Sequence, residues 1–296
     1  MSPPRTPTAL LRAFVHDHLG AGVTITDSSR RVGRQSVVWR IDGDDGFVHY
    51  LKQHEALGLY ERARMAYTDW TPQLEDGPCW HVPRVIAQDD ELGILLLEAL
   101  PGGTRVSELP AGPAKAEAYR AAGCLLRALH DLPVPERPEP VAHMRAQIDR
   151  YVRNHAAVLD AGTRSWLLQR LDDGRPFAGA PIVCTHRDYS PRNWAAARVH
   201  GEMIVSVFDW ERAEVDCAFH DMQRMEYDHW LEAPDLKHAF LDGYGGGLSP
   251  AQQEQLDLVV LINAVASVAW ARDRGDTPFE RLAQAAIDRL QARDRP

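Results

Sequence analysis

The feature that most constrains the fold is a polar motif set between two apolar segments. The segment PIVCTH runs into the spelling HRDxxxxN, which carries Asp188 and Asn193, and the apolar segment MIVSVFDW then carries Asp209. Short apolar runs bounded by turn residues are typical of buried strands, and His200 with Gly201 indicates a hairpin before the second run. We therefore expect Asp188 and Asn193 to follow one strand and Asp209 to end another.

These three side chains suit the transfer of a phosphoryl group. That reaction needs a carboxylate that orients the attacking hydroxyl and accepts its proton, and oxygen ligands that hold a magnesium ion. Asp188 can supply the base, and Asn193 with Asp209 can supply the metal ligands. The alternative is that Asp188 and Asn193 only shape a surface loop, because Asp, Asn, Ser and Pro are common turn residues. A lysine and a glutamate further upstream favour the catalytic interpretation.

The first third of the chain combines short strands with two helices. Residues 8–20 are predicted to be helical, and residues 23–53 alternate apolar and polar side chains around Gly and Asp turns, which is typical of antiparallel strands. The cluster IDGDDG predicts a hairpin between VVWRI and FVHYLKQ. Residues 57–70 have helical periodicity, and HVPRVIAQ and ELGILLLEAL follow as two further strands.

Lys52 lies late in the second strand of that hairpin. A kinase needs a flexible loop over the nucleotide phosphates and a lysine on its third strand, and Gly33 and Ser36 in GRQS fit such a loop. Glu61, on the helix at 57–70, is our candidate to orient Lys52. Each residue also has a plainer explanation, because edge strands carry solvated lysines, one glycine is weaker than a full Gly-rich loop, and helix surfaces carry solvated glutamates.

A hinge and a helical region follow. The turn sequence PGG indicates a hinge at about 97–103, so we expect a nucleotide-binding domain at 1–100 and a second domain at 104–296 that holds the catalytic loop and the substrate. Most of the second domain has helical patterns. Helices are expected at 114–130, 141–159 and 164–172, and over the chain that follows Asp209.

Composition narrows the class of protein. Acidic residues outnumber basic ones by 42 to 33, and the formal net charge of −9 disfavours nonspecific nucleic-acid binding and suits a cationic small molecule. The four cysteines have no close pairs, so neither a zinc knuckle nor a disulfide framework is indicated. The sequence has no apolar run of membrane-spanning length and no secretory signal pattern. We expect a cytoplasmic monomer or homodimer with no membrane partner.

Together these landmarks resemble the aminoglycoside phosphotransferase family over nearly the whole chain. They are GRQSVVWRI, Lys52, Glu61, ILLLEALPGG, THRDYSPRN, VFDWERA, Asp221 and AFLDGYGGGLSP. The resemblance implies an α+β, bilobal protein-kinase-like fold, with a small antiparallel sheet in the N-terminal lobe and a mainly helical C-terminal lobe. It also implies MgATP as donor, with GTP not excluded.

The resemblance carries roles onto individual residues of this chain. It implies Asp188 as the catalytic base, Asn193 and Asp209 as magnesium ligands, and Lys52 on the nucleotide phosphates. Backbone groups from Glu98 to Leu100 would hold the adenine.

Arg187 departs from the family pattern, which usually has Gly between the His and the Asp, and matches the protein-kinase spelling instead. In protein kinases that arginine can meet a phosphorylated loop, but the segment ERAEVDCAFHD after Asp209 contains no Ser, Thr or Tyr. We therefore expect Arg187 to be structural or to bind local carboxylates such as Glu211 or Asp216. His186 is expected to be a hydrogen-bonded structural residue, because Asp188 already serves as the base.

The acceptor stays open at this level. Several acids would suit a polycationic antibiotic, or are a solvated helix surface; they are Glu211, Glu214, Asp216, Glu226, Asp228, Glu232 and Asp235. Four histidines could instead meet a neutral polar substrate; they are His143, His155, His220 and His229. The leading hypothesis is a resistance kinase for an aminoglycoside-like or other cationic antibiotic. The alternatives are a metabolic kinase of choline, a sugar or homoserine, and a catalytically silent pseudokinase.

Overall fold

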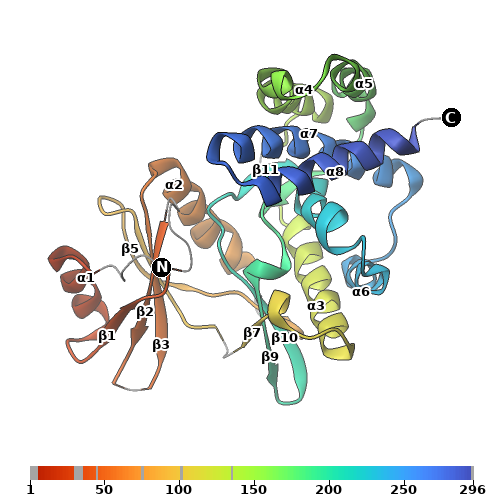
Figure 1. Ribbon diagram of the computed structural model, residues 1–296. Helices are drawn as coiled ribbons and strands as arrows, with labels where there is room; N and C mark the ends of the chain where they lie inside the picture. Colours follow the sequence, from red (N-terminus) through yellow and green to blue (C-terminus); the bar gives the residue numbers. More distant parts are fainter. Residues whose placement is uncertain are drawn as a thin grey trace. The chain divides into compact units, whose positions relative to one another are not determined.

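A computed structural model describes residues 6–29, 36–44, 46–74, 77–100, 103–134 and 136–294. The chain forms two compact units (Figure 1). Unit 1 consists of Met1–Ala114 and Pro191–Ala213, and unit 2 of Lys115–Ser190 and Glu214–Pro296. The chain therefore passes from one unit to the other within the motif region, between Asp188 and Asn193 and again after Asp209. The expected α+β class is confirmed, with the main antiparallel sheet in unit 1 and the longest helices in unit 2.

Unit 1 is built around a five-stranded antiparallel sheet with the order β1-β2-β3-β6-β5. Its strands are β1 (Thr24–Asp27), β2 (Ser36–Asp42), β3 (Val48–His54), β5 (Val85–Asp89) and β6 (Ile94–Leu97). The expected hairpin joins β2 to β3, and Gly46 in its turn has a φ of 81°, which glycine adopts without a steric penalty. All four residues of β6 are buried, as its apolar sequence predicts.

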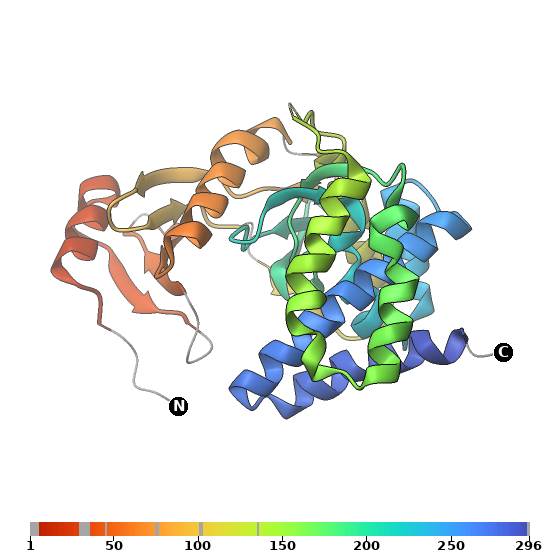
Figure 2. The same ribbon diagram turned by 90° about the horizontal axis from the view of Figure 1, so that it is seen from above.

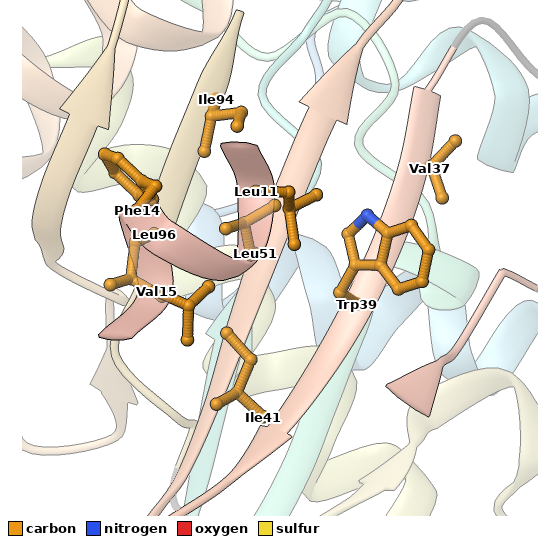
Figure 3. Close-up of a cluster of buried hydrophobic side chains, with 9 residues drawn as sticks. All are labelled: Leu11, Phe14, Val15, Val37, Trp39, Ile41, Leu51, Ile94 and Leu96. Carbon is orange, nitrogen blue, oxygen red and sulfur yellow. The ribbon is translucent and has the colours of Figure 1, made fainter. Parts of the chain in front are cut away.

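Helix α1 (Ala9–Leu19) covers part of this sheet. It begins after Thr8, whose hydroxyl accepts a hydrogen bond from the Leu11 amide, a normal N-cap. Leu11, Phe14 and Val15 recur at helical spacing and lie over buried sheet residues such as Leu51 (Figure 3). Burying each side chain of this kind stabilises the fold by about 1.5–3 kcal/mol.

The helix expected at 57–70 is present but changes type along its length. It is α-helical in α2 (Leu57–Met65), a π-helix in η1 (Ala66–Trp70), and a 3₁₀ turn in η2 (Thr71–Gln73). The wider π turn puts both Tyr67 and Trp70 among the buried side chains. π turns inside helices are frequent at functional sites, and the Tyr67 hydroxyl hydrogen-bonds with the backbone of Asp209.

A second, four-stranded sheet completes unit 1, with the order β4-β10-β9-β7. The hairpin expected around His200 and Gly201 is confirmed, because β9 pairs with β10 in antiparallel register from Trp194↔Val207 to Val199↔Glu202. The elements of this part are β4 (Trp80–His81), β7 (Thr104–Arg105), η3 (Val106–Glu108), η6 (Pro191–Asn193), β9 (Trp194–Val199) and β10 (Glu202–Val207).

Unit 2 is mainly helical, as expected, and α7 (Pro250–Arg274) and α8 (Thr277–Arg293) run side by side (Figure 2). The other elements are α3 (Pro113–His130), α4 (Pro140–Tyr151), η4 (Arg153–Val158), α5 (Ala161–Leu171), η5 (Asp172–Phe177), β8 (Ile182–Thr185), β11 (Glu214–Cys217), η7 (Ala218–Asp221), η8 (Met225–His229) and α6 (Pro234–Tyr244). Among the described residues α7 alone is long and apolar enough to cross a membrane, and 67% of its most apolar window is buried within the protein, as in the core helix of a soluble protein.

Two expectations about unit 2 are corrected. The helix expected at 141–159 ends at Tyr151 and continues only as 3₁₀ turns, and the next helix begins early because Asp160 accepts hydrogen bonds from the amides of Gly162 and Thr163. The segment after Asp209 was expected to be helical, but its first element is the strand β11, which pairs with β8 in antiparallel register. A four-residue strand is too short to show periodicity, and it forms because β8 offers backbone partners.

Candidate active site

Lys52 lies on β3 at the centre of the main sheet, opposite Val38 on one side and Leu95 on the other. Its ammonium group pairs with a carboxylate oxygen of Asp209 and, at 2.6 Å, with Oε2 of Glu211. Burial by itself would lower the pKa of Lys52, but the two carboxylates outweigh burial and the pKa is raised. Lys52 is therefore a buried cation beside one of the candidate metal ligands and is not a solvated edge lysine.

Asn193 and Asp209 are brought together by the hairpin of β9 and β10. Asn193 ends η6 directly before β9, Asp209 follows β10 after one residue, and the amide of Phe208 donates to the Asn193 carbonyl at 3.1 Å. Asp209 has a φ of 75°, a strained value for a residue other than glycine, and such strain gathers at functional sites. The Tyr67 hydroxyl hydrogen-bonds with the backbone of Asp209 and supports this conformation.

These two residues fit a magnesium ion by their chemistry. Magnesium prefers oxygen ligands and is commonly held by one or two carboxylates together with the phosphates of a substrate. Asp209 supplies a carboxylate, Asn193 supplies an amide oxygen, and the Glu211 carboxylate meets the same lysine as Asp209. Asn193 and Asp209 thus lie at neighbouring backbone positions in unit 1, and the Glu211 carboxylate lies beside the same lysine as Asp209.

The structure does not bring Glu61 to Lys52. Glu61 is exposed on α2 and makes no contact with Lys52 in the described part of the chain, because the buried face of this helix carries Leu59, Tyr60 and Ala63. Glu211 takes the place expected of Glu61. It follows Asp209 by two residues in VFDWERA, at a position that a glycine occupies in the protein-kinase motif DFG. That difference in spelling is the signal that could have identified it.

Three further residues support Glu211 from different elements. The Ser36 hydroxyl, at the start of β2, donates to Glu211 Oε2 at 3.3 Å, and Arg62 Nε of α2 donates to its backbone carbonyl at 3.1 Å. His54 Nε2 lies 3.9 Å from the same carboxylate, and burial lowers the pKa of His54 to about 4, so this imidazole is neutral at pH 7. Ser36 was expected in a loop over the phosphates, but it is the first residue of β2 and bonds with a carboxylate that pairs with Lys52. Gly33 lies outside the described residues.

The segment expected to hold adenine follows β6. The Glu98 amide donates to the Arg84 carbonyl at 2.9 Å. An adenine would therefore have to meet other backbone groups between Glu98 and Leu100. Pro101 and Gly102 of the expected hinge lie outside the described residues.

Asp188 belongs to unit 2, on the loop that follows β8. Its amide donates to Nδ1 of His186 at 3.3 Å, so the buried His186 is a structural residue of this loop. Its carboxylate oxygen Oδ1 accepts a hydrogen bond from Nη1 of Arg224 at 3.1 Å. Arg224 could not be predicted as this partner, because nothing local marks a single arginine on a helical turn as a partner of Asp188.

The backbone of this loop is held by Asp221. The Asp221 carboxylate accepts hydrogen bonds from the amides of His186 and Arg187, at 3.0 Å and 2.5 Å. The buried His130 of α3 lies 3.1 Å from the same carboxylate and 2.8 Å from the Tyr244 hydroxyl. A carboxylate that accepts from two successive amides holds the loop rigidly, and this rigidity favours a fixed position for Asp188.

Arg187 binds local carboxylates, as expected, although only one of the two named partners is correct. Its guanidinium lies 2.5 Å from Asp216 Oδ2 and 3.1 Å from Glu214 Oε2, whereas Glu211 pairs with Lys52. Asp216 is fully buried and also accepts from Nε2 of His143 at 2.6 Å. Burial would raise the pKa of Asp216, but the surrounding basic groups outweigh it and hold the pKa far below its usual range.

Most of the acids that could bind a cationic substrate already pair with basic side chains of the chain itself. Glu211 pairs with Lys52, Glu214 and Asp216 pair with Arg187, and Glu226 pairs with Lys237 at 2.7 Å. Asp228 lies 3.7 Å from His229, and Glu232 and Asp235 are exposed. Two of the four candidate histidines also have partners within the chain, since His143 and His220 both lie beside Asp216. His155 is exposed.

Comparisons with known proteins relate this chain to phosphotransferases. A family model described as the phosphotransferase enzyme family matches residues 30–253. A curated relative, the N-acetylmuramate/N-acetylglucosamine kinase of Pseudomonas aeruginosa, is 31% identical over 173 residues, which are 55% of this chain and 50% of the relative. The matched part thus spans about half the length of that relative.

Two solved structures share the fold over almost the whole chain. The GDP and kanamycin complex of APH(2″)-IIia has a TM-score of 0.68 at 12% identity, covering 96% of this chain and 98% of the other. A choline/ethanolamine kinase family protein from Mesorhizobium loti has a TM-score of 0.66 at 18% identity, covering 96% of this chain and 94% of the other. At these identities the likeness concerns the fold, and the expected protein-kinase-like fold is confirmed.

Proposed function

The chain belongs to the phosphotransferase enzyme family, and from that premise we propose that it transfers the γ-phosphoryl group of MgATP to a hydroxyl group of a small molecule. The observation that carries the proposal is the ion pair of the buried Lys52 with Asp209 in unit 1, on a hairpin whose other strand begins directly after Asn193. Asp188, on a loop braced by Asp221 in unit 2, supplies the other chemical requirement. Intact Lys52, Asp188, Asn193 and Asp209 argue against a silent pseudokinase.

On the donor side, Lys52 would bind phosphate oxygens of the nucleotide while Glu211 holds its ammonium group in position. Asp209 and Asn193 would hold a magnesium ion, which neutralises the negative charge that the phosphates develop during transfer. Backbone groups from Glu98 to Leu100 are the proposed adenine contacts. ATP is the proposed donor and GTP stays open, since the related APH(2″)-IIia was solved with GDP.

On the acceptor side, Asp188 orients the attacking hydroxyl and receives its proton. The hydroxyl oxygen forms a bond to the γ-phosphorus, the bond from that phosphorus to the bridging oxygen breaks, and ADP leaves with the bonding electron pair. Direct transfer of this kind needs no covalent enzyme intermediate. The products are a phosphate ester, ADP and one proton.

The charges favour a neutral or anionic acceptor over a polycationic antibiotic. Four of the acids that would have to bind a polycation pair with lysine or arginine of the chain itself, and the Asp188 carboxylate adjoins the Arg224 guanidinium. A polycation held near the reacting hydroxyl would gain little from Asp188, because Arg224 already neutralises that carboxylate. A hydroxylated metabolite of the sugar type, like the substrates in the name of the Pseudomonas aeruginosa kinase, is therefore our first candidate, and an antibiotic is the second.

The test is a coupled ADP-release assay with MgATP across a panel of acceptors. The panel contains N-acetylglucosamine, N-acetylmuramate, other sugars, choline, homoserine, aminoglycosides and a macrolide. The blank is Asp188→Ala, which is expected to lower turnover by at least about a hundredfold, as for the loss of a positioned base. Turnover of sugars supports the proposal, turnover of aminoglycosides alone favours the antibiotic hypothesis, and equal rates for parent and Asp188→Ala would remove Asp188 from its role.

We propose a cytoplasmic enzyme that acts as a monomer or homodimer without nucleic-acid or membrane partners. We also propose that the lobes divide near residues 97–103. A drug-resistance phenotype on expression in a susceptible bacterium would support the antibiotic hypothesis.

A further inference from the structure

Arg224 is a largely enclosed arginine that contacts the proposed catalytic base. It lies in unit 2 between η7 and η8, and its Nη1 atom is 3.1 Å from Oδ1 of Asp188. Only 18% of the Arg224 side chain and 14% of the Asp188 side chain are exposed. Surface ion pairs contribute little because water screens them, whereas a pair this enclosed interacts more strongly.

Other groups hold the guanidinium in place. It stacks over the ring of Phe279 on α8 at 5.5 Å, and it hydrogen-bonds with Tyr227. Burial would lower the pKa of Arg224, but Asp188, Tyr227 and Asp228 outweigh burial and the pKa is raised. The arginine is thus a permanently charged, oriented partner of the Asp188 carboxylate.

We propose that Arg224 is a positioning residue for the catalytic base, fixing the rotation of the Asp188 carboxylate so that the acceptor hydroxyl meets it in one orientation. The inference rests on the proposed function of Asp188. A lone carboxylate rotates between several orientations, and misplacing a catalytic group by about 1 Å reduces rates by about a hundredfold. A guanidinium restrains a carboxylate well, because its donors lie in a rigid plane.

Kinetic measurements distinguish a positioning role of Arg224 from two simpler roles. An arginine that only stabilises the fold would affect the amount of folded protein and not the rate per folded molecule. An arginine that binds an anionic group of the acceptor would affect the KM of anionic acceptors and leave neutral ones unchanged. A positioning residue affects kcat for every acceptor, including water, and acts only when Asp188 is present.

The experiment compares Arg224→Ala, Arg224→Lys, Asp188→Asn and the double variant Arg224→Ala/Asp188→Asn. Arg120→Ala is the matched control, because Arg120 also pairs with an aspartate in unit 2, Asp242 at 3.0 Å, but on the exposed surface. For each variant kcat and KM are measured with the best acceptor of the panel. The slow hydrolysis of MgATP, in which water replaces the acceptor, is measured in parallel, and the thermal shift with MgATP reports nucleotide binding.

We expect Arg224→Ala to lower kcat and the hydrolysis rate by about ten- to a hundredfold, with the MgATP thermal shift unchanged. Arg224→Lys should recover part of the loss, Arg120→Ala should match the parent, and Arg224→Ala should cause no further loss in the Asp188→Asn background. Losses that multiply in the double variant, or a change confined to the KM of anionic acceptors, would overturn the inference.

The failure of the proposed function would look different. A parent protein that neither phosphorylates any acceptor nor hydrolyses MgATP would contradict the proposed function, and the inference with it. A parent protein that hydrolyses MgATP through Asp188 but is insensitive to Arg224→Ala would overturn the inference alone.

Discussion

At the residue scale, the clearest departure from expectation is the partner of Lys52. The Glu211 carboxylate lies 2.6 Å from the Lys52 ammonium, whereas Glu61 is exposed. Because Lys52 is buried, removing the charge of Glu211 should disturb the position of the Lys52 ammonium group. Removing the charge of a solvated glutamate elsewhere should disturb it less.

We therefore expect Glu211→Gln to weaken MgATP binding by about tenfold, equivalent to about 1.4 kcal/mol, and Glu61→Gln to bind MgATP like the parent. Titration calorimetry with MgATP measures both constants without any acceptor. Weakened binding by Glu61→Gln together with normal binding by Glu211→Gln would restore Glu61 as the residue that orients Lys52.

Histidine protonation is a second effect at this scale. His220 is buried next to Asp216, Asp221, Arg187 and His143, and burial lowers its pKa to about 4 from an ordinary value of 6.5. Because its pKa is lower in the folded protein than in the unfolded chain, the unfolded chain binds more protons between these values. The free energy of unfolding should therefore fall as the pH falls from 6.5 towards 4.

His220→Gln should remove this contribution. Between pH 6.5 and 5 we expect the parent to lose about 1–2 kcal/mol more stability than the variant, measured by urea unfolding at each pH. His155→Gln, at an exposed position, should behave like the parent. A parent and a His220→Gln variant with parallel pH dependence would contradict a neutral His220.

At the element scale, two glycines allow α3 and α6 of unit 2 to approach closely. A Cβ atom on Gly243 would lie 2.0 Å from the Arg120 carbonyl oxygen, and one on Gly123 would lie 2.1 Å from that of Phe240. Only glycine permits two helices to approach this closely, because any side chain would meet backbone atoms that cannot move independently.

Gly243→Ala should accordingly destabilise the protein by about 1–3 kcal/mol, as for overpacking of a core. Gly247→Ala is the matched control, since a Cβ there meets nothing within 4 Å and the residue has no positive φ that would strain it. Thermal unfolding of both variants measures the difference. Equal melting temperatures would mean that α3 and α6 can separate without loss.

The strand β11 has a larger effect on the candidate site than its four residues suggest. It pairs with β8, the strand that leads into the loop carrying Asp188, and this pairing places Asp216 opposite Val183. Asp216 is thereby held where Arg187 can reach it. Local pattern recognition missed this element because its strand conformation comes from a partner distant in sequence.

At the scale of the whole molecule, the segment Pro191–Ala213 is grouped with the N-terminal part of the chain. Lys52, Asn193 and Asp209 therefore belong to the same compact unit, while Asp188 and Arg224 belong to the other. The proposed nucleotide-binding groups and the proposed proton acceptor are thus carried by different parts of the fold.

Binding of magnesium with ATP should stabilise the protein through the nucleotide-binding groups of unit 1 and not through Asp188. A ligand that binds the folded state at a hundred times its Kd stabilises it by about 2.7 kcal/mol, so saturating MgATP should raise the melting temperature of the parent more than ATP with a chelator. Asp209→Ala should lose that magnesium-dependent part, and Asp188→Ala should keep it. Equal magnesium-linked shifts in Asp209→Ala and the parent would contradict the metal assignment.

Local sequence patterns were enough to predict the strands of the main sheet and most helices of unit 2. They also identified Lys52, Asp188, Asn193 and Asp209 as candidates. Periodicity and turn residues are local properties, and the motif spellings are read directly from neighbouring residues. The tertiary structure decided which charges meet: Glu211 with Lys52, Asp216 with Arg187, and Arg224 with Asp188. Such pairs depend on which face of a helix is buried and which strands become neighbours, and both are set by packing of the whole chain.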